Sequence, residues 1–125
     1  MTPYSPFKGK QGLKRIFNAT GYSVAGFKSA FRLEAAFRQI ILLNIVLGII
    51  NFSLHLSALE HAILLIVGLL AIIVELFNSA IEAVVDRISL ERHELSKNAK
   101  DMGSAAQSVA LIMIAATWAI ILFWT

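Results

Sequence analysis

The sequence predicts an all-α membrane protein, with one N-terminal amphipathic surface helix and three transmembrane helices. Hydrophobic residues make up 58% of its 125 residues, more than the usual share in soluble domains of about 45 to 50%. Three apolar stretches, at about 35–54, 58–88 and 102–124, reach the length of roughly 20 residues that a helix needs to cross a hydrocarbon core of about 30 Å. Three helices in one chain offer little interior for polar side chains, so we expect a homo-oligomeric helical bundle.

The segment before the first span divides into two parts. Residues 1–12 contain Pro, Gly and Lys without an apolar run, so we expect a poorly ordered tail and no cleavable signal. Over residues 13–34, apolar side chains recur at helical spacing with Lys and Arg on the flanks, which predicts an amphipathic helix in the membrane interface. Gly21 and Gly26 favour a kink or a break in this helix near residues 21–23.

The basic residues are distributed unevenly along the chain. All 11 Lys and Arg residues lie before or in the first turn of the first span, or between the last turn of the second span and the start of the third. The positive-inside rule therefore places the N-terminus in the cytoplasm and the C-terminus on the opposite side. A net charge of +3 indicates contact with anionic headgroups or phosphates, and we expect no nucleic-acid partner. The chain has no cysteine, which excludes disulfides and thiol chemistry.

A polar stripe interrupts the second span. In ELFNSAIEAVVD (75–86), five polar side chains fall within about 100° of one another around a helix. They are Glu75, Asn78, Ser79, Glu82 and Asp86. A carboxylate at bilayer depth is disfavoured by about 2.5 to 3.5 kcal/mol, so the stripe should face protein, a metal ion or water. The alternative is a polar seam between helices, which Asn78 and Ser79 alone would provide.

The depth of this stripe separates two classes of function. Glu75 follows Glu60 by about 22 Å along a helix, which places it in the inner leaflet. Glu82 lies about 10 Å further along, at the cytoplasmic interface. A proton-coupled transporter would favour a carboxylate at the midplane. This stripe instead suits chemistry on a lipid headgroup with a water-soluble cosubstrate.

Two more groups of polar residues lie near the cytoplasmic boundary. Glu34 precedes the first span and could bind a divalent ion together with Glu82, whereas a surface ion pair between Glu34 and Arg38 is the alternative. The polar connection at 87–106 brings phosphate-binding donors and metal-binding acceptors to the inner rim, and a solvated loop would explain its cations alone. Its charged and titratable members include Glu91, Arg92, His93, Glu94, Lys97, Lys100 and Asp101.

Three segments resemble the signature of the small prokaryotic integral-membrane diacylglycerol kinases. They are GYSVAGFKSAFRLEAAFRQ (21–39), ELFNSAIEAVVDR (75–87) and HELSKNAKDMGSAA (93–106). The resemblance implies a homotrimer in the bacterial inner membrane, with the C-terminus in the periplasm and active sites shared between neighbouring subunits. It also implies transfer of the ATP γ-phosphate to diacylglycerol, which gives phosphatidic acid. A kinase of a polyprenol such as undecaprenol, and a small proton-coupled transporter, are the alternatives.

The resemblance also implies roles for individual residues. Glu75 matches the catalytic glutamate, the base for the lipid hydroxyl, and Glu34 and Glu82 match the carboxylates that bind Mg²⁺. Residues around the nucleotide are implied at Arg15, Tyr22, Glu34, Asn78, Glu82, Glu91, Arg92, His93, Lys100 and Asp101. Residues near the lipid are implied at Arg15, Ser23, Phe37, Arg38, Glu75 and Ser104. Residues 89–92 depart from the Gly-Ser-Glu-Tyr of the family.

Overall fold

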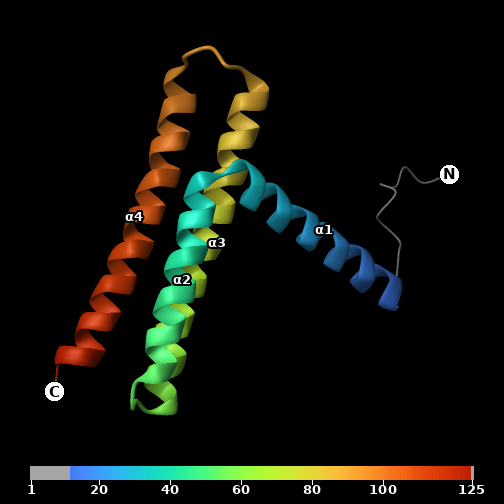
Figure 1. The fold of residues 1–125 in the computed structure, drawn as a ribbon. Helices are drawn as coiled ribbons and strands as arrows, with labels where there is room; N and C mark the ends of the chain where they lie inside the picture. The colour runs from blue at the N-terminus through green and yellow to red at the C-terminus, as the bar shows by residue number, and fades with distance from the viewer. Residues whose placement is uncertain (1–11, 125) are drawn as a thin grey trace.

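The computed structural model describes residues 12–124, and nearly all of this range is helical (Figure 1). The four helices are α1 (Gly12–Leu33), α2 (Ala35–Ser53), α3 (Ala58–Ile88) and α4 (Glu94–Phe123). No strand occurs within residues 12–124, so the predicted all-α fold is confirmed. The tail predicted at residues 1–12 lies outside the described residues, apart from Gly12 at the start of α1.

Three of the helices, α2, α3 and α4, are long and apolar enough to cross a membrane. With 31 and 30 residues, α3 and α4 are each about 45 Å long, which exceeds a hydrocarbon core of about 30 Å. Figure 1 shows these helices side by side, with α3 and α4 continuing past the junction of α1 and α2. The hairpin end is defined here by residues 89–93, and the turn end by residues 54–57.

Helix α1 leaves the bundle at an angle (Figure 1). It exposes large apolar side chains, among them Leu13, Phe17 and Phe31, as expected of a helix that lies in a membrane interface. The predicted break near residues 21–23 is wrong, because α1 is one uninterrupted helix, and the predicted kink stays a prediction. A glycine costs a helix only about 1 kcal/mol relative to alanine, and two such costs do not end a helix that is amphipathic over its whole length.

Arg38 fixes the junction between α1 and α2. Its Nη1 donates hydrogen bonds to the carbonyl oxygen of Phe31 at 2.7 Å and to that of Arg32 at 3.3 Å. Carbonyls in the last turn of a helix lack a partner within that helix, and a cation there also interacts favourably with the helix dipole. Phe37 is buried at the same junction, with its ring centroid 6.4 Å from that of Phe27. These contacts tie α1 to the bundle.

The core of the bundle lies where α3 packs against α2 and α4. Its buried members are Ile40, Val67, Ala71, Ala110 and Ile114. Ala71 is fully buried, and a side chain this small allows close approach of neighbouring helices. Between α2 and α3, Gly68 in the same way leaves room for the amide of Asn44.

Polar contacts close the turn end. Ser57 and Glu60 form a reciprocal capping box at the start of α3, with the N–H of Glu60 donating to Ser57 Oγ at 3.2 Å and the N–H of Ser57 donating to Glu60 Oε1 at 2.9 Å. The buried amide of Asn51 donates to the carbonyl of His61 at 3.0 Å. The capping box fixes where α3 begins. The bond from Asn51 ties the end of α2 to the first turn of α3.

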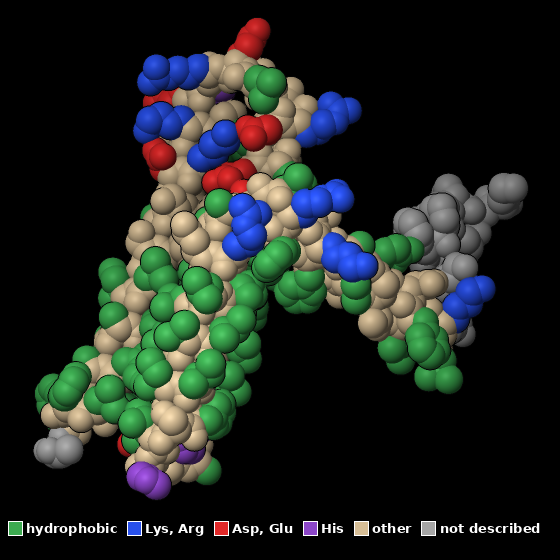
Figure 2. Space-filling view, viewed as in Figure 1, with side chains coloured by type: hydrophobic (Ala, Val, Ile, Leu, Met, Phe, Trp, Pro, Cys, Tyr) green, Lys and Arg blue, Asp and Glu red, His purple; other side chains and the backbone are tan. Residues whose placement is uncertain are grey.

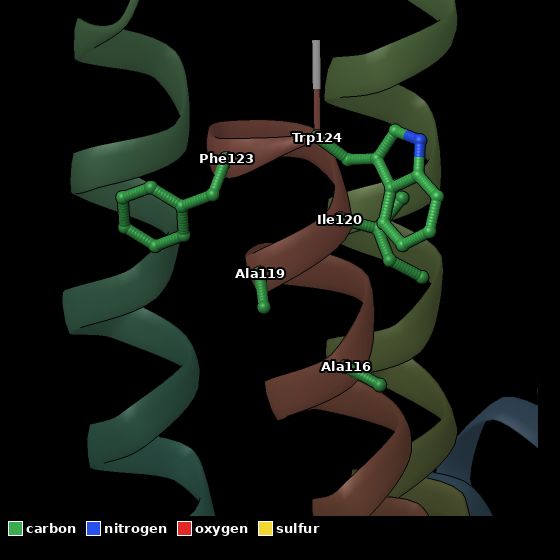
Figure 3. Close-up of a pocket in the computed structure, with 5 residues that line it drawn as sticks. All are labelled: Ala116, Ala119, Ile120, Phe123 and Trp124. Atoms are coloured by element: carbon green, nitrogen blue, oxygen red, sulfur yellow. The ribbon is translucent and has the colours of Figure 1, made fainter.

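The C-terminal end of α4 lines a cleft of about 500 Å³ (Figure 3). Its lining residues are Ala116, Ala119, Ile120, Phe123 and Trp124. All five side chains are hydrocarbon apart from the indole N–H of Trp124, so this cleft offers no group for acid–base or phosphate chemistry. The chemistry of the chain has to be sought at the other end of the bundle.

The start of α4 differs from the expectation. Helix α4 begins at Glu94, eight residues before the span predicted at 102–124. Most of the polar connection predicted at 87–106 is therefore helical, and the non-helical part is confined to residues 89–93. His93 caps α4, because its Nδ1 accepts a hydrogen bond from the N–H of Leu95 at 3.0 Å. Histidine is not among the usual N-cap residues, so this helix start had no familiar signal in the sequence.

Candidate active site

Charged side chains gather at the hairpin end and along one edge of α1, whereas apolar side chains cover most of the bundle between them and the turn end (Figure 2). The polar stripe of α3 runs toward the hairpin end. It starts at Glu75, which is 3% exposed, and ends at Asp86, which is exposed. The stripe thus joins the apolar part of α3 to the charged end of the molecule.

Glu75 is held by a residue that the sequence analysis missed. Gln107 of α4 donates a hydrogen bond from Nε2 to Glu75 Oε2 at 2.8 Å, and the same nitrogen lies 3.3 Å from the carbonyl oxygen of Ala71. A buried carboxylate is costly unless such a partner compensates for lost hydration. The signal that could have identified Gln107 is its spacing, because it follows Gly103 by one helical repeat on the face of α4 that meets α3.

The next turn of α3 carries Asn78 and Ser79. Gly103 of α4 packs directly on Asn78 Oδ1, and a Cβ at this position would collide with that oxygen. Asn78 Oδ1 and Ser79 Oγ are both buried and lack a hydrogen-bond partner among the described residues. A buried polar atom without a partner costs about 1 to 3 kcal/mol, so these two atoms mark a place where a polar ligand would be stabilised.

Glu34 reaches the stripe from the other side. It is the N-cap residue of α2 but makes no side-chain capping bond. It lines a cleft of about 270 Å³ between the end of α1 and α3, to which Ser79 and Ala83 also contribute. The alternative ion pair with Arg38 does not form in the described part of the chain, since Arg38 binds the carbonyls of α1 instead.

Two further carboxylates lie near the polar stripe, Glu34 at the start of α2 and Glu82 on α3. Glu34 lines the cleft beside Ser79, whereas Glu82 does not line that cleft and is half-buried on α3, about two turns beyond Glu75. Within residues 12–124 no group of three or more metal-ligating side chains comes together. Mg²⁺ usually takes one or two carboxylates and completes its shell with water and phosphate oxygens. The oxygen donors of Glu34 and Glu82 therefore fit this ion.

A second cleft lies at the hairpin end, with a volume of about 190 Å³. It brings together four of the residues expected around a nucleotide: Glu91, Arg92, His93 and Lys100. Lys100 Nζ forms an ion pair with Asp86 Oδ1 at 2.8 Å, which links α4 to the end of the polar stripe. Asp101 instead forms an exposed ion pair with Lys97 at 2.6 Å within α4 and does not line this cleft.

The residues expected near a lipid are more scattered. Phe37 lines a cleft of about 540 Å³ between α1 and α2, where the side chains of Phe27 and Phe31 also lie. Ser23 is exposed and donates to the carbonyl of Ala19 in its own helix at 3.0 Å. Ser104 is exposed on α4, and Arg38 is used at the α1–α2 junction.

Arg15 and Tyr22 are not brought to the hairpin cleft. Both are exposed on α1, which points away from the hairpin formed by α3 and α4 (Figure 1), and neither lines that cleft. A single chain therefore gathers only part of the residues expected around a nucleotide.

Comparison with known proteins identifies the family of this chain. Residues 21–122 match the family model described as prokaryotic diacylglycerol kinase. A diacylglycerol kinase of Pseudomonas aeruginosa is 69% identical, and the alignment covers 98% of each chain. Diacylglycerol kinases of Escherichia coli K12 and Haemophilus influenzae are 47% and 45% identical over 90% of this chain, covering 92% and 96% of those proteins. The chain thus belongs to the prokaryotic diacylglycerol kinase family.

Proposed function

We propose that this protein is an ATP- and Mg²⁺-dependent diacylglycerol kinase that transfers the γ-phosphate of ATP to diacylglycerol and forms phosphatidic acid. The observation that carries the proposal is the position of Glu75. This carboxylate is buried on a helix apolar enough to cross a membrane, and the helix leads directly into a charged hairpin end. A lipid hydroxyl and a water-soluble nucleotide would meet there, and the relatives' names point to the same reaction.

Glu75 acts as the general base in this proposal. The oxygen of the lipid hydroxyl forms a bond to the γ-phosphorus while the bond from that phosphorus to the bridging oxygen breaks and ADP leaves. The hydroxyl proton moves to the Glu75 carboxylate and from there to solvent. Phosphoryl transfer depends on in-line positioning and charge neutralisation more than on covalent help, so one buried, oriented carboxylate is enough protein chemistry for this step.

Glu34 and Glu82 would hold Mg²⁺, since Glu34 lines the cleft beside the stripe, Glu82 is a member of the stripe, and both supply hard oxygen donors. When bound, the ion would supply positive charge that neutralises the phosphates. Asn78 presents an unpartnered buried oxygen beside this place and would orient a ligand or a phosphate-bound water. Arg92, His93 and Lys100 would bind the nucleotide at the hairpin cleft, for which Lys100 must exchange its partner Asp86 for phosphate.

Neighbouring subunits would complete the site in a homotrimer. Arg15 and Tyr22 are exposed on α1, which projects from the bundle (Figure 1), and in a homotrimer this helix would bring them to the hairpin cleft of another copy. Asp101, Ser23 and Ser104 are also exposed. Shared active sites of this kind account for a set of expected residues that one chain does not gather.

The orientation in the bacterial inner membrane follows from charge. The hairpin end and α1 carry the Lys and Arg side chains (Figure 2), which favours the cytoplasmic side for both and the periplasm for the C-terminus. The chain has no cysteine, so single cysteines placed at the exposed Leu90 and His55 would report the orientation. In intact cells an impermeant maleimide should label His55→Cys but not Leu90→Cys, and the reverse pattern would contradict the proposed orientation.

A transfer assay tests the function directly. Purified protein in mixed micelles is incubated with γ-labelled ATP and a short-chain diacylglycerol, with and without Mg²⁺. Label that appears in phosphatidic acid only with Mg²⁺ supports the proposal. Label in undecaprenol, offered in parallel, at a higher kcat/KM than in diacylglycerol would make the protein a polyprenol kinase. No transfer to any lipid alcohol would overturn the kinase function.

A further inference from the structure

Gln107 stands out among the polar residues of α4. It lies between Gly103 and Ala110, which are both buried against α3, and it is the residue of α4 that bonds to the carboxylate of Glu75. The sequence around it, SAAQSVALIMIAA, is otherwise free of amide and charged side chains. Its Oε1 is buried and has no hydrogen-bond partner among the described residues. A buried polar side chain in an apolar segment is costly, so its presence points to a specific role.

Gln107 donates a hydrogen bond to one oxygen of the Glu75 carboxylate. Nε2 donates to Glu75 Oε2 at 2.8 Å, and its distance of 3.3 Å from the Ala71 carbonyl oxygen fixes the direction in which the amide nitrogen points. Within residues 12–124 no donor is found for the other carboxylate oxygen, Oε1. An amide N–H is a donor that cannot take up a proton itself, so it can orient the base without competing with it.

We propose that Gln107 is a positioning residue of the kinase reaction. By binding Oε2 of Glu75, it fixes the carboxylate in one rotamer and leaves Oε1 as the atom that accepts the hydroxyl proton of the lipid. The inference rests on the proposed function of Glu75 as the base. Helix α4 is otherwise expected to contribute residues that bind the nucleotide and the lipid headgroup. In this proposal it also influences the proton transfer directly.

A purely structural role for Gln107 predicts different behaviour. Hydrogen bonds between membrane-spanning helices contribute little to stability on average. A residue of that kind changes the fraction of folded protein without changing the turnover of the folded fraction. A positioning residue changes kcat of the folded protein while leaving the KM values for both substrates alone, because the interaction matters only when the proton is transferred.

The test replaces Gln107 by Met, which keeps the length of the side chain but removes the N–H donor. In the full-length protein we expect kcat to fall about tenfold to one-hundredfold, as for loss of a hydrogen bond to a charged group, with little change in KM for ATP and for diacylglycerol. Gln107→Asn, which is one methylene shorter, gives a second variant should the first fold poorly. Ser108→Ala is the matched control on the exposed side of α4, and it should retain wild-type kinetics.

Infrared spectroscopy gives a readout that does not depend on activity. The carboxylate stretching band of Glu75, identified in protein with ¹³C-labelled glutamate by its loss in Glu75→Gln, should shift in Gln107→Met and stay in place in Ser108→Ala. An unchanged band or an unchanged kcat in folded Gln107→Met would overturn the inference. A shifted band in a protein that phosphorylates no lipid at all would instead overturn the proposed function and leave the contact between the two side chains established.

Discussion

The contact between α3 and α4 has two halves that share one helix-pair geometry and differ in chemistry. Toward the turn end, Val67 and Ala71 of α3 pack against Ala110 and Ile114 of α4. Toward the hairpin end, polar groups meet instead, in the pairs Glu75 with Gln107, Asn78 with Gly103 and Asp86 with Lys100. Small residues allow close approach in both halves.

This difference between the two halves indicates which contacts determine stability and which determine catalysis. Apolar contacts tolerate changes of residue as long as volume is conserved, whereas a buried carboxylate or amide is costly as soon as its specific partner is lost. Substitutions in the apolar half should therefore affect how firmly the helices are held together. Substitutions of the charged side chains in the polar half should affect turnover first, whereas substitution of Gly103, which packs on Asn78, should affect stability. Three experiments test this division, in order of decreasing effect.

Glu75→Gln should have the largest effect. It keeps the size of the side chain but removes the base, so kcat should fall by about a thousandfold, within the range of general base catalysis, while the dependence of the rate on ATP and Mg²⁺ changes little. Glu60→Gln, at the turn end of the same helix, is the control, because glutamine still serves in a capping box. Near-wild-type turnover of Glu75→Gln in folded protein would show that the base is another group.

Lys100→Met should have an intermediate effect. Removal of a cation that binds phosphate should lower kcat/KM for ATP by about tenfold to one-hundredfold. Lys14→Met is the matched control, since Lys14 is exposed on α1 and does not line the hairpin cleft. Steady-state kinetics at varied ATP measure both variants. Equal losses in the two would mean that general positive charge, not the position of Lys100, accounts for nucleotide binding.

Gly103→Ala should have the smallest effect of the three, and on stability. The added Cβ meets Asn78 Oδ1, and overpacking of this kind costs about 1 to 3 kcal/mol. Gly48→Ala is the control, because nothing lies within 4 Å of a Cβ built there and alanine favours a helix over glycine by up to about 1 kcal/mol. Unfolding in mixed micelles with increasing denaturing detergent measures both. Equal stability of the two variants would contradict close packing at Gly103.

Much of the fold could be predicted because a membrane constrains helices by length and polarity. The three apolar stretches became helices, and the carboxylates of α3 were placed by spacing alone. The start of α4 was missed because His93 is an unusual cap. The break in α1 was predicted from Gly21 and Gly26, whose cost is too small to end the helix.

The candidate site was less predictable, because it depends on contacts between helices. Periodicity placed Glu75 and Asn78 on one face of α3. The spacing of Gln107 after Gly103 indicates which face of α4 it lies on, but not which residue of α3 it meets. Gln107 is a single uncharged residue in an apolar run, so neither charge nor motif drew attention to it. The partner of Lys100 was missed for the same reason, since Asp86 and Lys100 come together only through the hairpin.

The attachment of α1 through Arg38 has a consequence for how the protein responds to the thickness of its membrane. Because the last turn of α1 is bound to the first turn of α2, a helix that floats at the headgroups of one leaflet determines how deep the bundle sits. When a bilayer becomes thicker or thinner, the mismatch should then be taken up at the turn end, in the opposite leaflet. Glu75 would keep its depth relative to the headgroups beside α1, so turnover should follow the composition of that leaflet more closely than the total thickness of the membrane.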